Sequence, residues 1–522
     1  MPPPKSLQVK LTDDHAPGTT AAATADADAT AFCVFTDEPR LPVAPHLDEH
    51  SRRTVEDLLR AGEFKGEADD ALIIYTPDAG TRDGAPRRVL LLVGLGSHED
   101  FTRDTLRRAA AVAVRRAREA RVRHLKFMLP GDVADGDDGA PELAFVAAEG
   151  AHLGCYENDF YQSREAEDEP ALERFTIATA AAAPDEDHQR PLLHAALERA
   201  RVVAEAANWA RALADEPGGS LPPREFARRA AAMAAEFGLA VETLDAGEIR
   251  ARGMGGLWGV GQGSDEPPAL IVVRYEPEGA SDDDELWAFV GKGITFDTGG
   301  ISIKPAQGME EMKSDMAGGA AALGALRAVA ELKLKRRVVA IVPTAENMPS
   351  GRALKPGDVV RTLAGYTIEV VDTDAEGRLV LVDGIAYARS LGASRIVDLA
   401  TLTGSIIVAL GDHRTGLFSN DDAWAARVQS AAARAGEPAW RMPASDDYKK
   451  KIESPIADFK NYGGRPDATA AALLLSKFAG DTPWVHLDIA ATSWHEEAQP
   501  HAPAGATGTG VRTLVELARG EL

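Results

Sequence analysis

Short apolar runs alternate with longer helical stretches along most of the 522-residue chain. The runs are about as long as buried strands, and the Ala-, Glu- and Arg-rich stretches between them favour helices. An order of strand, helix and strand folds into a sheet with helices packed against it, which defines the α/β class. Because the chain exceeds one ordinary core, we expect roughly two to four domains.

The first half of the chain contains one clear example of strand, helix and strand in sequence. Apolar runs at 89–93 and 125–129 flank a helical stretch over 102–121. Gly94 and Gly96 follow the first run, but no third glycine completes a dinucleotide-binding turn. A plain strand-to-helix turn is therefore favoured.

Composition divides the chain into parts. Residues 1–28 are rich in Pro, Ala, Thr and Asp and lack the features of a secretory signal, so they predict a loose tail. A smaller N-terminal α/β domain is expected over 29–190, and its acidic last part, from 165 on, is interpreted as a surface connection. A linker helix is expected over 191–215. A larger C-terminal α/β domain follows over 216–522.

The C-terminal domain is expected to contain a central, mostly parallel or mixed sheet covered by helices. Apolar runs predict strands at 269–275, 286–290, 338–342, 368–371, 396–399 and 484–489. Helical patterns occur at 316–334, 376–391 and 422–435.

Charge and cysteine content argue against several classes of protein. The formal net charge of -24 repels phosphate backbones, so nucleic-acid binding is not expected. Cys33 and Cys155 are far apart in sequence and have no metal-type spacing, which predicts reduced core thiols. No apolar run approaches the ~20 residues that cross a bilayer. We expect a cytoplasmic protein without membrane contact.

Charged residues cluster in three short segments near strand ends and glycine-rich turns. The first segment, 290–305, presents Lys292, Asp297 and Lys304 from a largely apolar, glycine-rich stretch. The second, 312–321, places Asp315 before a helical pattern, where a helix N-cap explains it as well as a ligand does.

The third segment, 372–379, contains Asp374, Glu376 and Arg378 at alternate positions. These side chains would point the same way if the backbone were extended, although a solvated acidic turn explains the segment equally well when it is taken alone.

Taken together, the segments predict a two-metal site. If the four carboxylates of these segments converge, they repel one another unless cations lie between them. Oxygen ligands without a histidine cluster suit Mg²⁺, Mn²⁺ or Zn²⁺, and paired ions of this kind activate water and polarise a carbonyl group. Lys304 and Arg378 would then supply positive charge at the developing oxyanion.

These three segments resemble the signature blocks of the leucyl aminopeptidase family, also called cytosol aminopeptidases. The resemblance covers roughly residues 200 to 520, and further similar segments follow in the same order. They include 253–257, 261–264, 398–404, 454–458, 484–490 and 505–508.

The resemblance implies a metallo-exopeptidase whose catalytic di-metal domain is 216–522. Asp297 and Glu376 would bridge both ions, Asp374 would complete the exchangeable site, and Lys292 with Asp315 would complete the tighter one. A lysine ligand must be neutral, which an adjacent dication enforces by lowering its pKa. The ions would be Mn²⁺ or Zn²⁺, with Mg²⁺ or Co²⁺ as alternatives.

The family mechanism also implies roles for further residues. Arg378 would hold a bicarbonate that acts as general base, and Lys304 would be the second catalytic residue. The substrates would be short peptides with a preferred N-terminal Leu or Met, cleaved by a homohexamer. The positions that match substrate-binding residues are Met312, Thr401, Leu402 and Gly404.

The chain departs from the family pattern at two places. Asp372 occupies a position that is usually Asn, and residues 215–219 replace an Asn-containing segment. The first change places an additional charge beside the ligands, which would shift the metal preference.

Two other functions agree less well with the sequence. A two-metal phosphatase or nuclease would need more Arg and Lys near the site. Some bacterial relatives in this family bind DNA as architectural or regulatory proteins, but the acidic balance counts against that additional role here.

Overall fold

The computed structural model describes residues 7–11, 27–41, 47–77, 87–131, 139–163, 172–178, 186–281 and 283–520. The chain divides into two compact units, which are described separately. Unit 1 comprises residues 1–205 and 497–504, and unit 2 comprises residues 206–496 and 505–522. The division falls within the long helix α4 (Glu186–Asp215), and the domain limits expected from composition remain a prediction.

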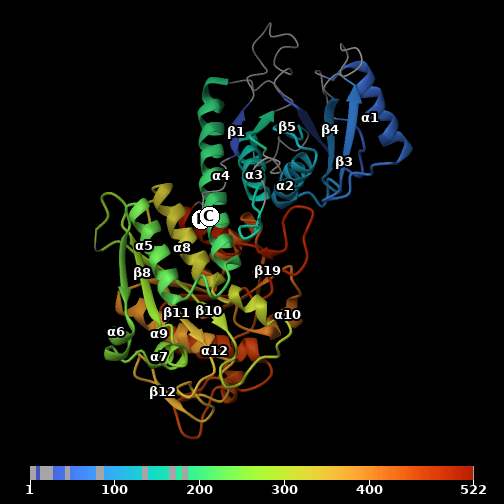
Figure 1. Ribbon diagram of the computed structural model, residues 1–522. Helices are drawn as coiled ribbons and strands as arrows, with labels where there is room; N and C mark the ends of the chain where they lie inside the picture. Colours follow the sequence, from blue (N-terminus) through green and yellow to red (C-terminus); the bar gives the residue numbers. More distant parts are fainter. Residues whose placement is uncertain are drawn as a thin grey trace. The chain divides into compact units, whose positions relative to one another are not determined.

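Unit 1 contains a six-stranded sheet in the order β1-β6-β5-β2-β4-β3 (Figure 1). Neighbouring strands are parallel except for the antiparallel pair β3 and β4. The strands are β1 (Gln8–Leu11), β2 (Ala29–Val34), β3 (Ala71–Pro77), β4 (Arg87–Gly94), β5 (His124–Met128) and β6 (Arg174–Ala178). The helices are α1 (Glu49–Ala61), α2 (Arg103–Glu119), α3 (Gly139–Gly154) and the first part of α4.

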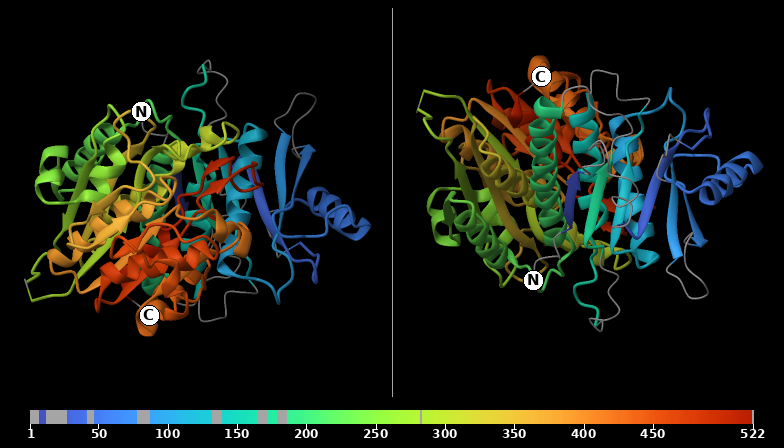
Figure 2. Two further views of the ribbon diagram at one scale, coloured as in Figure 1. Left: turned by 90° about the horizontal axis from the view of Figure 1, so that it is seen from below. Right: turned by 90° about the horizontal axis from the view of Figure 1, so that it is seen from above.

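Alternation along β4 explains why helices cover both faces of this sheet. Leu91 and Val93 belong to one core with the buried residues of α2 and α3, whereas Leu90 and Leu92 belong to a second core with Val55 of α1. Successive strand residues point to opposite faces, so a continuous apolar run needs cover on both sides. Figure 2 shows the dark blue α1 and the cyan α2 on opposite sides of the strands.

Two expectations for unit 1 were wrong in part. Within the expected loose tail, Gln8–Leu11 forms β1 and pairs in parallel with β6. Within the expected surface connection, Arg174–Ala178 forms β6, which lies between β1 and β5. Both segments are too short for a clear periodic signal, so only their pairing shows that they are strands. Residues 1–6, 12–26, 164–171 and 179–185 lie outside the described residues.

Unit 2 is built on a nine-stranded mixed sheet, as expected. The order is β16-β15-β18-β14-β9-β11-β8-β7, with β10 paired to β11. The central neighbours β18, β14, β9 and β11 are parallel, and β10 is parallel to β11. The strands are β7 (Ala240–Leu244), β8 (Ala269–Tyr275), β9 (Leu286–Gly291), β10 (Gly293–Asp297), β11 (Arg337–Asn347), β14 (Arg395–Ala400), β15 (Thr415–Ser419), β16 (Ala439–Arg441) and β18 (Trp484–Asp488).

The strand expected at 368–371 does not belong to the central sheet. It corresponds to β13 (Thr367–Glu369), which forms a small separate sheet with β12 (Val359–Arg361) and β17 (Phe459–Lys460). A second small sheet joins β19 (Trp494–His495) to β20 (Gly505–Ala506).

Two helical layers cover the central sheet of unit 2. The contacts between elements place α5, α8, α11 and α13 in one layer and α7, α9 and α12 in the other. The helices are α5 (Pro223–Glu236), α6 (Ala246–Ala251), α7 (Gly255–Gly261), α8 (Ala317–Glu331), α9 (Gly377–Ser390), α10 (Gly404–Leu410), α11 (Asp422–Arg434), α12 (Asp467–Ala479) and α13 (Val511–Arg519), with 3₁₀ helices η2 (Met309–Ser314) and η3 (Asp446–Lys451). No helix in the described ranges combines the length and apolar character that a bilayer span requires.

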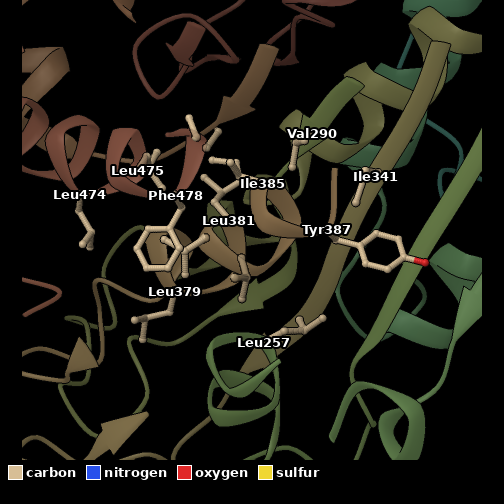
Figure 3. Close-up of a cluster of buried hydrophobic side chains, with 14 of the residues drawn as sticks. Leu257, Val290, Ile341, Leu379, Leu381, Ile385, Tyr387, Leu474, Leu475 and Phe478 are labelled. Carbon is tan, nitrogen blue, oxygen red and sulfur yellow. The ribbon is translucent and has the colours of Figure 1, made fainter. Parts of the chain in front are cut away.

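Apolar side chains hold α9 in place on the sheet. Figure 3 shows Leu381 and Ile385 of α9 close to Phe478 of α12, and the same core includes Val290 of β9 and Ile341 of β11. Burial of these side chains fixes the N-terminus of α9 at the end of the sheet where the charged segments lie.

A buried carboxylate on the same helix gives a stability prediction. Asp383 of α9 is fully buried, and it accepts hydrogen bonds from Leu257 N at 2.9 Å and Leu363 N at 2.8 Å. We expect Asp383→Ala to lower the free energy of unfolding by about 2 to 6 kcal/mol, because two N–H groups lose their acceptor at ~1–3 kcal/mol each. Urea denaturation measures the change. Asp245→Ala, which removes only an exposed helix cap, is the control, with an expected loss of ~1 kcal/mol.

Candidate metal centre

The charged residues of the three segments meet at the carboxyl ends of the parallel strands of unit 2. Lys292 follows β9, Asp297 is the last residue of β10, and Thr401 follows β14. Asn347 ends β11 and lies opposite Asp297 in the parallel register. Open α/β sheets form their binding sites at this edge, because loops from neighbouring parallel strands converge there.

Asp297 is held rigidly from one side. It is 2% exposed, and its Oδ1 accepts hydrogen bonds from Gly299 N and Asn347 Nδ2, both at 2.8 Å. Its Oδ2 lies 2.9 Å from Lys304 Nζ, and the same ammonium lies 2.5 Å from Asp374 Oδ1. Lys304 therefore joins the first and third sequence segments.

Lys292 joins the second and third segments. Its Nζ lies 2.8 Å from Asp315 Oδ1 and 2.7 Å from Glu376 Oε1, and all three residues are buried. Gly377 makes this approach possible, because a Cβ there would lie 2.8 Å from the Nζ atom. Asp315 is not the N-cap of α8, since Met316 holds that position, and its Oδ1 instead accepts a hydrogen bond from Thr401 Oγ1 at 2.6 Å.

The helix expected at 376–391 is confirmed as α9, so the extended backbone that would align the alternate residues of the third segment is not present. Glu376 has helical dihedral angles and is the N-cap of α9, so Arg378 already lies in the first helical turn. Asp374 precedes the helix in a turn in which its backbone N–H donates to Asp372 Oδ1 at 2.9 Å. The carboxylates of Asp374 and Glu376 nevertheless reach the same place as that of Asp297, with ligand atoms within 4.8 Å of one another.

The electrostatics of the cluster suit bound cations. Four carboxylates face two lysine ammonium groups, so the ionised cluster has an excess of two negative charges. Burial raises the pKa of Glu376, and the neighbouring Asp297 raises it further. Burial also raises the pKa of Asp315. Neutral carboxyl groups are the alternative to bound cations here.

Two buried oxygens also lack hydrogen bonds. Among the described residues, Asp315 Oδ2 and Glu376 Oε1 have no donor in hydrogen-bonding geometry, although the latter lies close to Lys292 Nζ. Buried acceptors without donors are costly unless a ligand satisfies them. Carboxylate oxygens with a lysine nitrogen therefore fit one or more divalent ions.

Arg378 is buried and already bonded on one side of its guanidinium. Nη1 donates to Asn461 O at 2.8 Å and to Asp467 Oδ1 at 2.9 Å, and Nη2 donates to Asp467 Oδ2 at 3.2 Å. Its Nε has no partner in the described part of the chain. The Nε–H group is thus a buried donor without an acceptor among the described residues, which would suit a planar anion.

The residues expected to contact substrate lie in two segments. Met312 is part of η2, and Thr401, Leu402 and Gly404 belong to the loop and helix start after β14. Met312, Thr401 and Leu402 are half-buried and Gly404 is exposed. Thr401 links this loop to the charged cluster, because its carbonyl oxygen accepts from Lys292 Nζ at 3.0 Å.

The sequence did not indicate several residues that hold the site. Asn461 Oδ1 accepts from Val371 N at 2.8 Å, and its Nδ2 donates to Asp372 O at 2.6 Å, which fastens the third segment. Asn347 was also not indicated, because the run expected as a strand ends at 342, whereas β11 continues to Asn347. No local pattern distinguishes Asn461, which lies about 90 residues from its partners.

Comparison with known proteins gives a consistent result. The model of the catalytic domain of the cytosol aminopeptidase family matches residues 208–515, and the model of its N-terminal domain matches residues 31–165. A probable cytosol aminopeptidase of Acidobacterium capsulatum is 44% identical over 89% of this chain and 89% of its own. One of Solibacter usitatus is 45% identical over 90% of this chain and 93% of its own.

Solved structures agree with this result. A mutant of tomato leucine aminopeptidase has a TM-score of 0.84 and 29% identity, covering 99% of this chain and 97% of its own. The bottromycin maturation enzyme BotP in complex with Mn has a TM-score of 0.79 and 36% identity, covering 94% of this chain and 99% of its own. The chain therefore belongs to the cytosol aminopeptidase family, with both the N-terminal and the catalytic domain of that family, and is a peptide hydrolase.

Proposed function

We propose that this protein is a two-metal aminopeptidase that removes N-terminal residues, preferably Leu or Met, from short peptides. The observation that carries the proposal is the cluster of four carboxylates at the end of the central sheet, three of them buried and one, Asp374, exposed, with two buried oxygens left without hydrogen-bond donors. The BotP structure contains Mn, which supports a metal in this fold. Family membership supports peptides as substrates.

The residues present would hold two ions. Asp297 and Glu376 are the proposed ligands of both, Asp374 adds to one ion, and Lys292 with Asp315 adds to the other. Two divalent ions, Mn²⁺ or Zn²⁺ with Mg²⁺ or Co²⁺ as alternatives, supply an activated water and a polarised peptide carbonyl when bound.

Lys304 and Arg378 are the proposed catalytic residues. The Lys304 ammonium is held in the cluster by two carboxylates, where it would stabilise the negative charge that develops on the peptide carbonyl oxygen. Arg378 would bind bicarbonate as the general base. The two terminal nitrogens of its guanidinium, Nη1 and Nη2, already donate to Asp467. The anion would therefore bind the remaining N–H groups on the Nε side.

The substrate side of the site would be formed by the two segments that contain Met312 and Thr401. Met312, Leu402 and Gly404 are proposed to contact the first residue and its backbone. An apolar pocket separates Leu from smaller side chains by about 1 to 3 kcal/mol per methylene, so the preference is expected to be moderate.

Family resemblance also supports a homohexamer and a cytoplasmic location as parts of the proposal. Sedimentation of the purified protein tests the first. A DNA-binding role is not included, because the net charge of -24 opposes it.

Removal of metal tests the proposed function. We expect dialysis against a chelator to abolish hydrolysis of leucine p-nitroanilide, and addition of Mn²⁺ or Zn²⁺ to restore it, because the carboxylate cluster needs bound cations to act on the peptide bond. Activity is measured at 405 nm, and metal content is measured by mass spectrometry in the same samples. Full activity in a sample free of metal would rule out the two-metal mechanism.

A further inference from the structure

A buried carboxylate outside the proposed metal centre contacts the loop after β14, residues 401–404. Asp488, the last residue of β18, is fully buried and is not one of the proposed ligands. It accepts hydrogen bonds from Thr403 Oγ1 at 2.6 Å and from Leu402 N at 3.2 Å, with a longer contact from Thr403 N at 3.4 Å. One carboxylate therefore fastens the loop after β14 through both a side chain and the backbone.

The other side of this loop contacts the metal centre. Thr401 Oγ1 donates to Asp315 Oδ1 at 2.6 Å, and Thr401 O accepts from Lys292 Nζ at 3.0 Å. Residues 401–403 thus lie between the Asp488 carboxylate and two of the proposed ligands. A shift of the loop would move the substrate contacts and the ligand side chains together.

A group of buried, hydrogen-bonded side chains precedes Asp488 on β18 and lies on the neighbouring strand β14. His486 lies two residues earlier on β18, so both side chains are on the same face of the sheet. Asp398 of β14 lies opposite His486 in the strand register, and its Oδ1 is 2.6 Å from His486 Nδ1. Trp484 Nε1 donates to the other Asp398 oxygen. All four side chains are buried.

We propose that Asp488 is a positioning residue that fixes the loop 401–404, and through Thr401 the side chains of Lys292 and Asp315. The proposal deepens the proposed function, because it assumes that this loop binds the peptide. A hydrogen bond from a hydroxyl to a buried carboxylate is among the stronger kinds, which makes it suited to holding a short loop at fixed distance. Placement errors of ~1 Å are enough to impair catalysis.

Four variants separate positioning from general stability. Thr403→Val removes the 2.6 Å bond to Asp488 with little change of shape, and Thr403→Ser retains the hydroxyl. Thr513→Val is the matched control, because Thr513 Oγ1 also donates to a buried carboxylate, Glu437 Oε2, at 2.6 Å, but from α13. Asp488→Asn is a second test, because the amide keeps only one acceptor oxygen and its NH2 group cannot replace the other, so either the Thr403 hydroxyl or the Leu402 N–H loses its acceptor.

Hydrogen exchange of the metal-loaded protein, followed by mass spectrometry, measures how firmly the loop 401–404 is held. We expect amides of residues 401–404 to exchange roughly 10-fold faster in Thr403→Val and Asp488→Asn, near wild type in Thr403→Ser, and unchanged in Thr513→Val. In the hydrolysis of leucine p-nitroanilide, KM should rise roughly 10-fold in Thr403→Val, more than kcat falls, because the loop contacts the substrate.

The outcomes are distinguishable. Unchanged exchange at 401–404 in both Thr403→Val and Asp488→Asn overturns the proposal, as does a KM that rises equally in Thr513→Val. Faster exchange with unchanged KM shows a structural bond without a positioning role and also overturns it. If the wild-type protein hydrolyses no aminoacyl anilide with any metal, the proposed function fails, whereas the exchange result still decides whether Asp488 holds the loop.

Discussion

Asp297→Ala and Glu376→Ala are each expected to remove both metal ions and to lower kcat/KM roughly 10³-fold or more, since paired ions supply several kcal/mol of transition-state stabilisation. Both residues are 2% exposed and lie within the cluster. As proposed ligands of both ions, each would leave both ions short of a ligand when it is removed. Without the two ions, the repulsion between the remaining carboxylates would also be less well screened.

The measurement is metal content per chain together with activity at saturating Mn²⁺. Asp383→Ala is a suitable control, because it also removes a buried carboxylate of unit 2 but one that contacts only backbone N–H groups. It should lose stability while it retains two ions per chain. Wild-type stoichiometry in both Asp297→Ala and Glu376→Ala would refute their assignment as shared ligands.

Periodicity predicted the central elements because they are long and buried. The run at 338–342 lies within β11, and the helical stretch at 316–334 contains α8. Strands that have little apolar length were missed or misplaced, as with β1 and β6, because their existence depends on a partner far away in sequence. The strand near 368 was found, but local pattern does not say which sheet a strand joins.

The proposed ligands could be selected from sequence because their segments combine charge with glycine and apolar residues, and because a family pattern matches them. The spatial arrangement of these ligands could not be predicted from the same patterns. The helix expected at 376–391 is confirmed as α9, but the sequence left open whether the alternate residues of the third segment share an extended backbone. Only the structure shows that the start of α9 brings Glu376 to Lys292. The supporting residues Asn461 and Asp488 were missed, because each acts across about 85 to 90 residues of sequence.

Lys304→Ala separates chemistry from metal binding. We expect kcat to fall by roughly 10² to 10³, the cost typical of losing one group that stabilises an oxyanion. Metal content should stay near that of the wild type. The Lys304 ammonium lies 2.9 Å from Asp297 Oδ2 and 2.5 Å from Asp374 Oδ1, so its removal adds negative charge to the cluster and does not weaken its attraction for cations.

The same geometry decides how the result is interpreted. Were Lys304 only a counter-ion for Asp297 and Asp374, divalent ions would replace its charge and kcat would be normal once metal is saturating. A role at the carbonyl oxygen instead predicts a kcat defect that excess Mn²⁺ does not correct, with a smaller change in KM. Lys304→Ala with normal kcat, or with activity lost only in proportion to lost metal, would therefore exclude the catalytic assignment.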